Sequence, residues 1–347
     1  MTVINTALLS FGMSGRVFHA PFIDLHPGFR LVGSWERSAK RIGERYPQAR
    51  SYDTLQDLLN DESIDLVVVN TPTLTHYEYT RRALEAGKHV VVEKAFAGNA
   101  SEAAELRDLA REVKRKLAVF QNRRWDSDFL SVREVLASGN LGDIVEASFG
   151  FLRFDPNLSE KSHKEEPSSG SGIVKDLGPH VIDQAITAFG FPESVFADID
   201  ITRQNSRVDD YFDILLFYSD KRVHVKGGYF FKQPMPEYSL FGKSGCYLKT
   251  RSDVQERQLQ LGMSPDDSDY GWEPAGREGH LHLGVGKDNR QELVTAPRGS
   301  YMKFYDGMYD AIANDLAEPV TAADGERVMR VIDAAFQSQQ SGQSVKP

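Results

Sequence analysis

Two charged residues at the end of an apolar run are the first candidates for chemistry in this sequence. Three valines, residues 90–92, are typical of a strand that is buried on both faces, and Glu93 and Lys94 follow them directly. A lysine that is partly removed from water can donate a hydrogen bond to a hydroxyl group and stabilise negative charge on its oxygen. The alternative is a lysine whose ammonium group reaches water from the end of a strand.

A second candidate pair lies in the stretch DLGPHVIDQAITAF. Asp176 and His180 are four residues apart, so they face the same side if this stretch is a helix with Pro179 in its first turn. Taken alone, Asp176 is more simply a helix cap, and His180 is more simply a core or surface histidine. Together with Lys94, a histidine that titrates near neutral pH is suited to take the proton of a hydroxyl group.

The elements that must position these residues begin with a glycine-containing loop, SFGMSGRVFHAP. Gly12 and Gly15 have the spacing of the last two glycines of a dinucleotide-binding fingerprint, while Ser10 replaces the first. Glycine lets backbone amides approach a pyrophosphate at the start of a helix, whose dipole favours negative charge. An ordinary tight turn is the alternative. We predict that the loop binds a dinucleotide cofactor through Ser10, Gly12, Met13, Ser14 and Gly15.

The residues after the second apolar run bear on the choice between NAD and NADP. Glu36 stands about 20 residues after the glycine loop and can accept hydrogen bonds from both ribose hydroxyls, which favours NAD and repels a 2′-phosphate. Arg37 opposes this preference because its guanidinium can bind that phosphate or stack on the adenine. The sequence therefore predicts NAD or NADP, with NAD favoured. A pair of solvated loop charges is the alternative.

The first third of the chain has the pattern of βαβ units. Short apolar runs alternate with helix-like segments, which indicates a parallel sheet of the α/β class. The helix-like segments are residues 77–86, closed by Gly87, and residues 100–114, opened by Asn99 or Ser101. The apolar runs are residues 3–11, 29–35, 65–70, 89–93 and 117–121.

The pattern changes after about residue 123. β-rich runs joined by turn-like pieces indicate a largely antiparallel sheet. Residues 155–172 predict a long polar loop, which is either functional or a solvated insertion. A chain of 347 residues suits two domains, and we predict a nucleotide-binding domain over residues 1–122 and a second domain over 123–347. The β-rich runs are residues 144–154, 212–218, 222–231 and 238–241, and the helices are near 129–138, 301–314 and 325–337.

Composition argues against several kinds of partner. A formal net charge of -9 without any basic run argues against a nucleic-acid surface. The single cysteine, Cys246, allows no internal disulfide and no cysteine metal site, which fits a reducing cytoplasm and predicts no metal. The N-terminus has no basic leader, and no apolar run approaches the roughly 20 residues needed to cross a membrane. The expected partner is a small molecule.

Several stretches together resemble a known family. The glycine loop, VVVNTPTLTHYEYTRRALEAGKHVVVEKAF, FQNRRWDSDFL and GSGIVKDLGPHVIDQAITAFG are similar to the glucose-fructose oxidoreductase, inositol dehydrogenase and MocA (Gfo/Idh/MocA) family, in particular its scyllo-inositol dehydrogenase-like branch. The likeness extends over nearly the whole chain. It implies a Rossmann domain, a C-terminal α/β domain with an open antiparallel sheet, a nicotinamide cofactor, a polyol or sugar substrate, and a homodimer or homotetramer.

The resemblance also assigns roles to residues. Glu93 and Lys94 match the family's Glu-Lys-Pro motif, with Ala95 in place of the proline and its fixed φ angle. Asp176 and His180 match the family's acid and histidine pair. The implied catalytic residues are Lys94, Asp176 and His180.

Further contacts are implied near the ends of strands. Thr71, Pro72 and His76 follow the run that ends at Asn70, where the family places a loop that touches the cofactor, although His76 could equally cap its helix. A salt-bridged hinge explains QNRRWD nearly as well as a substrate-lining role, and His163 could simply be a solvated loop residue. The implied cofactor set adds Glu93, Lys94 and Asn122, and the implied substrate set is Lys94, Arg123, Trp125, His163, Asp176 and His180.

The predicted reaction is the oxidation of an alcohol. His180 acts as the general base, Lys94 polarises the hydroxyl group, Asp176 orients substrate and histidine, and the nicotinamide receives a hydride. Two other functions known on this fold stay open: a glycosidase that retains its NAD, and a non-catalytic sensor of a sugar or cofactor. Net release of reduced nucleotide separates the dehydrogenase from the glycosidase, and turnover separates it from the sensor.

Overall fold

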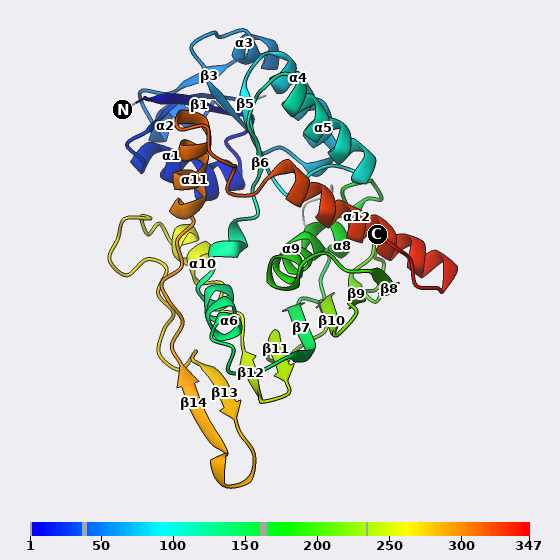
Figure 1. Cartoon of the computed structure of the whole chain (residues 1–347). Coiled ribbons are helices and arrows are strands. Elements are labelled where there is room, and N and C mark those ends of the chain that lie inside the picture. Colours follow the sequence, from blue (N-terminus) through cyan, green and yellow to red (C-terminus); the bar gives the residue numbers. More distant parts are fainter. Residues whose placement is uncertain (1, 37–39, 160–164, 234) are drawn as a thin grey trace. The chain divides into compact units, whose positions relative to one another are not determined.

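The chain forms two compact units in the computed structural model, which describes residues 2–36, 40–159, 165–233 and 235–347 (Figure 1). Unit 1 comprises Met1–Asn122, Gln255–Tyr270 and Ser300–Glu326. Unit 2 comprises Arg123–Val254, Gly271–Gly299 and Arg327–Pro347. The division is therefore discontinuous in sequence, and both units contain residues from the last third of the chain.

Unit 1 is built around a six-stranded parallel sheet with the order β3-β2-β1-β4-β5-β6, which is the strand order of a Rossmann fold. Its central strands β4 and β5 are almost wholly buried, as expected within a parallel sheet. The strands are β1 (Ile4–Leu8), β2 (Phe29–Trp35), β3 (Arg50–Tyr52), β4 (Leu66–Val69), β5 (His89–Val92) and β6 (Leu117–Val119). The helical segments are η1 (Gly15–His19), α1 (Ala20–Leu25), α2 (Ile42–Arg45), α3 (Leu55–Leu59), η2 (Thr73–Thr75), α4 (His76–Glu85), α5 (Ala100–Glu112) and α11 (Met302–Ala313).

The predicted parallel sheet of βαβ units is confirmed in unit 1. Asn99 caps α5, because its Oδ1 accepts a hydrogen bond from the Glu102 N–H at 2.9 Å. Gly87 follows α4 with φ of 74°, a left-handed conformation that favours glycine. Helices α4 and α5 lie side by side (Figure 1). Strand β3 was not predicted, since three residues are too few to show a period.

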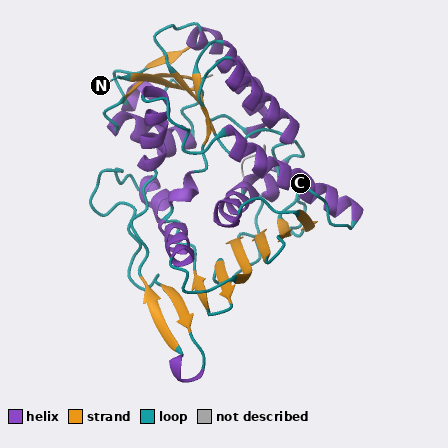
Figure 2. Cartoon of the chain, viewed as in Figure 1, coloured by secondary structure: helices purple, strands orange, loops and turns teal. Residues whose placement is uncertain are grey.

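Unit 2 contains an eight-stranded sheet with the order β14-β13-β12-β11-β7-β10-β9-β8. The described pairs are antiparallel apart from β7 and β10, which confirms the predicted second sheet. Residues of β8 and β9 alternate between buried and more exposed positions because helices pack on one face (Figure 2). The strands are β7 (Ile144–Leu152), β8 (Ser194–Asp200), β9 (Tyr211–Phe217), β10 (Arg222–Gly228), β11 (Tyr238–Gly242), β12 (Gly245–Lys249), β13 (Gly279–Leu283) and β14 (Arg290–Val294).

The helices of unit 2 differ from the prediction at one important place. The stretch 176–189, predicted as one helix, is interrupted at Leu177: Asp176 ends a short helix, α8 (Ile173–Asp176), and the remainder forms α9 (Gly178–Phe189). The other helical segments of unit 2 are α6 (Ser127–Ala137) and η4 (Gly286–Asp288), while η3 (Asn122–Trp125), α10 (Val254–Gln260) and α12 (Ala322–Ser341) include residues of both units. Among the described helices, none is both long and apolar enough to cross a membrane.

The described part of the polar loop 155–172 is anchored to the rest of unit 2. Buried Arg203 donates a hydrogen bond to the Asn157 carbonyl at 2.9 Å and pairs with Glu165 at 3.1 Å. The same guanidinium pairs with the fully buried Asp210 at 3.0 Å. These contacts favour a loop of defined conformation over a freely solvated insertion at the described residues.

His89 makes the stability of the fold depend on pH. Burial and then the charge of Arg115 lower the pKa of His89 to about 4, and its Nδ1 accepts a hydrogen bond from the Lys116 N–H at 2.9 Å. In the unfolded chain, the His89 imidazole takes up a proton near about pH 6.5, whereas in the folded chain it stays neutral until about pH 4. The stability that depends on neutral His89 is therefore complete above about pH 6.5 and is lost as the pH falls toward about 4. When the pH is lowered from about 7 to about 5, the free energy of unfolding should fall in both proteins. We expect this fall to be about 1 kcal/mol smaller in His89→Asn than in the parent. Urea unfolding at both pH values measures this, and equal losses in the two proteins would contradict it.

Candidate active site

The glycine loop of unit 1 packs closely at the end of β1. A Cβ at Gly15 would lie 2.4 Å from the Ser10 carbonyl oxygen and 2.9 Å from Asn70 Nδ2. Asn70 Nδ2 donates a hydrogen bond to the same Ser10 oxygen at 2.8 Å. Gly15 therefore permits the close approach of strand and helix that the last glycine of the fingerprint requires, and it opens a turn of π-helix, η1. The loop fits a dinucleotide pyrophosphate at the start of a helix.

We expect Gly15→Ala to destabilise unit 1 and to weaken nucleotide binding, because the added methyl group can enter only if the loop moves. The expected loss is about 1–3 kcal/mol of folding free energy. Gly12→Ala is the matched control for stability, since a Cβ there meets only the flexible Ser10 hydroxyl, at 3.3 Å. Thermal unfolding with and without NAD or NADP measures both effects. An unchanged melting temperature and an unchanged nucleotide-induced shift in Gly15→Ala would refute this reading of the loop.

The Glu93 carboxylate joins the glycine loop to the end of β5. Its Oε1 accepts hydrogen bonds from Ser14 Oγ at 3.1 Å and from His19 Nε2 at 3.0 Å, and its Oε2 accepts one from the Lys94 N–H at 3.2 Å. Burial alone would raise the pKa of Glu93, but the hydrogen bond from His19 and the nearby charge of Lys94 hold this pKa below its usual range. The ionised carboxylate therefore fixes the backbone of Lys94 against the loop.

His19 supports Glu93 from the far side. Its Nδ1 lies 2.7 Å from the hydroxyl of Tyr305 on α11, and both side chains are fully buried. An ionised carboxylate only accepts hydrogen bonds, so Nε2 carries a proton, and in the neutral ring Nδ1 accepts from the Tyr305 hydroxyl. His19 was not among the predicted site residues. Its signal in the sequence is a single histidine in the otherwise apolar segment VFHAPFI.

His76 is a buried link between two loops. Its Nδ1 lies 2.7 Å from the Ala95 carbonyl oxygen and its Nε2 lies 2.8 Å from the Thr71 carbonyl oxygen. The alternative role as a cap of α4 is not observed, since Thr75 occupies the cap position. Burial lowers the pKa of His76 despite these carbonyl contacts. The ring therefore holds the loop after β4 to the loop after β5, in which the Lys94–Ala95 peptide bond is cis; Thr71 and Pro72 lie in the first of these loops.

The Glu36 carboxylate is occupied by contacts within unit 1. Its Oε2 accepts a hydrogen bond from the Arg41 N–H at 2.7 Å, and its Oε1 accepts from the Ile42 N–H at 3.1 Å and Ser51 Oγ at 2.7 Å. Glu36 thereby fixes the start of α2 and its neighbour β3. Binding of ribose by Glu36 stays a prediction, and Arg37 lies outside the described residues.

The predicted acid and histidine of unit 2 lie on either side of the interruption at Leu177. Asp176 is the last residue of α8 (Ile173–Asp176) and is half-buried, whereas His180 belongs to the first turn of α9 (Gly178–Phe189) and is buried. The His180 ring lies 6.3 Å from the ring of Phe151 on β7, measured between centroids. The sheet therefore supports the predicted base directly.

The start of α8 is set by Asp209. The Ile173 N–H donates to the Asp209 carbonyl oxygen at 2.8 Å, and the Val174 N–H donates to its carboxylate at 2.8 Å. Gly172 precedes the helix with φ of 86°, and a Cβ there would lie 2.1 Å from that carboxylate. A glycine is therefore required at this entrance, because both the conformation and the space exclude a side chain.

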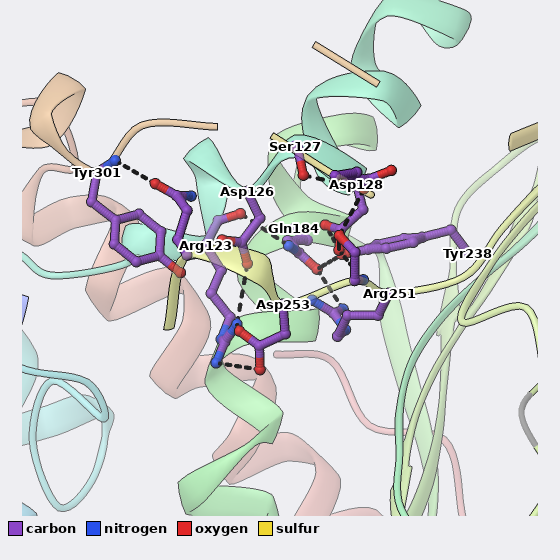
Figure 3. A network of polar contacts seen from close by, with 12 residues as sticks. Arg123, Asp126, Ser127, Asp128, Gln184, Tyr238, Arg251, Asp253 and Tyr301 are labelled. Carbon is purple, nitrogen blue, oxygen red and sulfur yellow. Dashed lines mark hydrogen bonds and ion pairs between the residues drawn. The ribbon is translucent and has the colours of Figure 1, made fainter. Parts of the chain in front are cut away.

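Arg123 belongs to a buried polar network of unit 2 (Figure 3). Its Nη1 lies 3.1 Å from Asp126 Oδ2 and 2.6 Å from Asp253 Oδ1, while Gln184 of α9 donates to its carbonyl oxygen at 3.1 Å. These contacts favour the salt-bridged alternative for Arg123 over a side chain that faces substrate. Of the other predicted contacts, Asn122 is buried at the end of unit 1's first segment, Trp125 is half-buried in η3, and His163 lies outside the described residues.

Tyr229 is a further candidate that was not predicted from the sequence. It follows β10 directly, and burial followed by the charge of Asp176 raises its pKa to about 12. Its phenol is therefore protonated and able to donate a hydrogen bond beside the predicted acid. No signal for it was available in the sequence, because the predicted β-rich run extended to residue 231, whereas strand β10 ends at Gly228.

Comparison with known proteins places the chain in a family. Residues 4–121 match the model for an oxidoreductase family's NAD-binding Rossmann fold, and residues 133–346 match that family's C-terminal alpha/beta domain. The chain belongs to the Gfo/Idh/MocA oxidoreductase family. The resemblance drawn from the sequence is thereby confirmed, and so is the expectation of an oxidoreductase that uses NAD or NADP.

Gfo/Idh/MocA relatives cover most of the chain. The scyllo-inositol 2-dehydrogenase (NADP(+)) IolW of Bacillus subtilis is 33% identical over 342 residues, which is 99% of this chain and 95% of that protein. The D-glucoside 3-dehydrogenase of Escherichia coli is 31% identical over 194 residues, 54% of this chain and 55% of that protein. The solved structure of yvaA from Bacillus subtilis has a TM-score of 0.95 at 32% identity and covers 99% of this chain and 98% of that chain.

Proposed function

We propose that this protein is an NAD(P)-dependent dehydrogenase that oxidises a hydroxyl group of a polyol or sugar, either inositol-like or a pyranose. The observation that carries the proposal is the Glu93 carboxylate, which ties Ser14 of the glycine loop to the strand end that bears Lys94. A lysine held beside the nucleotide loop suits a reaction between cofactor and hydroxyl. The two relatives named as an inositol dehydrogenase and a glucoside dehydrogenase support the substrate class.

The chain's own residues perform the proton chemistry. A ring nitrogen of His180 takes the proton of the substrate hydroxyl, and the Lys94 ammonium donates a hydrogen bond to the same oxygen as negative charge develops there. Asp176 orients the substrate and His180. The bound nicotinamide supplies the acceptor for the hydride that leaves the same carbon, so the alcohol becomes a carbonyl group.

The remaining roles divide between the two predicted domains. Residues 1–122 bind the nucleotide, and residues 123–347 bind the substrate and form a homodimer or homotetramer in the cytoplasm. The charge of Glu36 favours NAD over NADP. The proposed cofactor contacts are Ser10, Gly12, Met13, Ser14, Gly15, Glu36, Arg37, Thr71, Pro72, His76, Glu93, Lys94 and Asn122. Trp125 and His163 are proposed on the substrate side, whereas Arg123 is assigned to the buried salt-bridged network.

A substrate panel tests this function. Inositols, hexoses and methyl glucosides are each mixed with the protein and with NAD or NADP, and the absorbance of reduced nicotinamide is followed. We expect at least one substrate to give reduced nucleotide in proportion to substrate consumed. Glycoside cleavage without net reduction would favour the NAD-retaining glycosidase, and binding without turnover would favour the sensor.

A further inference from the structure

The parallel pair in the sheet of unit 2 delivers two polar residues to one place. Strands β7 and β10 run in parallel with Leu152 opposite Gly228, so the next residues, Arg153 and Tyr229, leave the sheet at the same end. The Arg153 N–H donates to the Gly228 carbonyl oxygen at 3.0 Å, which anchors its backbone. The position of Arg153 is thus set by the sheet and not by a loose loop.

Arg153 differs from the other arginines nearby because its guanidinium group makes no close ion pair with a described carboxylate. Its side chain is 44% exposed, and the described carboxylate that it meets is Asp253, only at 4.0 Å. Asp253 is already paired with Arg123 at 2.6 Å. By contrast, Arg203 is buried and pairs with two carboxylates at 3.0 and 3.1 Å. Arg153 therefore presents its fork of N–H donors to a ligand from outside the protein.

Two contacts place this guanidinium beside the proposed catalytic pair. Arg153 lies 4.5 Å above the centre of the Phe151 ring, the same ring that lies 6.3 Å from the ring of His180. Tyr229, which follows Gly228 opposite Arg153 in the parallel register, makes the second connection, since the charge of Asp176 raises its pKa and that of Arg153 lowers it. An oxygen bound by Arg153 would thus belong to the molecule that reacts at His180.

Arg251 strengthens the positive character of this region. Its buried guanidinium lies 4.6 Å above the centre of the same Phe151 ring. Its Nε and Nη2 donate to the Gly150 carbonyl oxygen, and Nη2 also donates to Gln184, while its Nη1 has no acceptor among the residues that the structure describes. With Arg123, at 5.1 Å from its centre, three guanidinium groups therefore lie over one aromatic ring next to His180.

We propose that Arg153 binds a carboxylate of the substrate, so that the molecule oxidised at His180 is a sugar acid such as a hexuronate or an aldonate. This inference rests on the proposed dehydrogenase function and names its substrate class. The guanidinium of Arg153 is planar and half-exposed, and two of its N–H groups can donate in parallel to the two oxygens of a carboxylate. A phosphate dianion fits less well, because Asp253 lies beside Arg153 and repels the two negative charges of a phosphate more strongly than the single charge of a carboxylate.

Matched pairs of acid and neutral sugars test the proposal. Glucuronate against glucose and galacturonate against galactose are compared by kcat/KM at equal ionic strength with NAD and NADP, and glucose 6-phosphate supplies the phosphate arm. We expect the acids to be preferred by about 10- to 100-fold, the usual effect of a charge-assisted hydrogen bond. Arg153→Gln should remove this preference by lowering only the rate with the acids. Arg222→Gln, at the exposed opposite end of β10, should keep it.

The outcomes separate this proposal from the function on which it rests. Equal use of neutral and acid sugars, preference for the phosphate, or a preference that survives in Arg153→Gln overturns the carboxylate site while the dehydrogenase stands. If no sugar is oxidised, the dehydrogenase fails, and calorimetric titration of the intact protein with glucuronate decides the carboxylate site separately. Binding that is lost in Arg153→Gln supports the site, whereas binding that is absent or equal in both proteins overturns it.

Discussion

Replacing His180 by alanine is expected to lower kcat by about 10²- to 10⁴-fold, which is the usual contribution of a positioned general base. His180 lies in the first turn of α9, and the glycine loop that is proposed to bind the nucleotide belongs to unit 1. The affinity for NAD and NADP should therefore stay close to that of the parent. Steady-state kinetics on the best substrate of the panel and nucleotide titrations measure the two quantities.

The pH dependence of this variant distinguishes a base from a packing residue. In the parent, the rate of oxidation should rise with pH as the base loses its proton, and His180→Ala should lose that rise. His280→Ala, which removes an exposed histidine from β13, is the matched control and should keep both the rate and the profile. An unchanged kcat in His180→Ala would remove this residue from the mechanism.

Replacing Lys94 by alanine is expected to lower kcat by about 10²- to 10³-fold, the effect of losing one donor to a developing oxyanion. The bond between Lys94 and Glu93 runs through the backbone N–H, so the substitution keeps it. The contacts from Ser14 and His19 to the Glu93 carboxylate are also retained. The loss should therefore appear mainly in turnover, with a smaller loss of nucleotide affinity from the proposed cofactor contact of Lys94 and no change in the melting temperature.

Lys303 offers a control of the same residue type. It lies exposed on α11 in unit 1, and Lys303→Ala should leave kcat unchanged. A drop in nucleotide affinity as large as the drop in kcat would show that Lys94 acts mainly by holding the cofactor. Equal turnover in Lys94→Ala and the parent would exclude the ammonium group from the reaction.

Segments with a clear period were predicted well from the sequence. Strand β2 was predicted with the bounds that the structure shows, and Asn99 was correctly named as a possible cap of α5. Strands β13 and β14 were not assigned, because their segment is polar and β14 is almost wholly exposed, so no alternation marks it. The interruption at Leu177 was also missed: Gly178 and Pro179 follow it, but Pro179 was expected to be tolerated in the first turn of a helix that already included Asp176.

The candidate site was only partly predictable, for a physical reason. Lys94, Asp176 and His180 were named as candidates because their residue types and local spacing carry chemical meaning, and their catalytic roles stay predictions. The bond between His19 and Glu93 joins residues 74 positions apart, and no local pattern signals such a contact. The three hydrogen bonds to Glu36 likewise depend on how α2 and β3 fold back onto the carboxylate.

Direct transfer of an isotope tests the central claim most closely. A substrate found by the panel is labelled with deuterium at the carbon that bears the reacting hydroxyl and is incubated with the protein and NAD or NADP. The account predicts that the deuterium appears at C4 of the reduced nicotinamide, in an amount equal to the carbonyl product, and that His180→Ala slows its appearance. Product that forms without deuterium in the nucleotide, or a sugar that is cleaved while the nucleotide stays oxidised, would contradict the account.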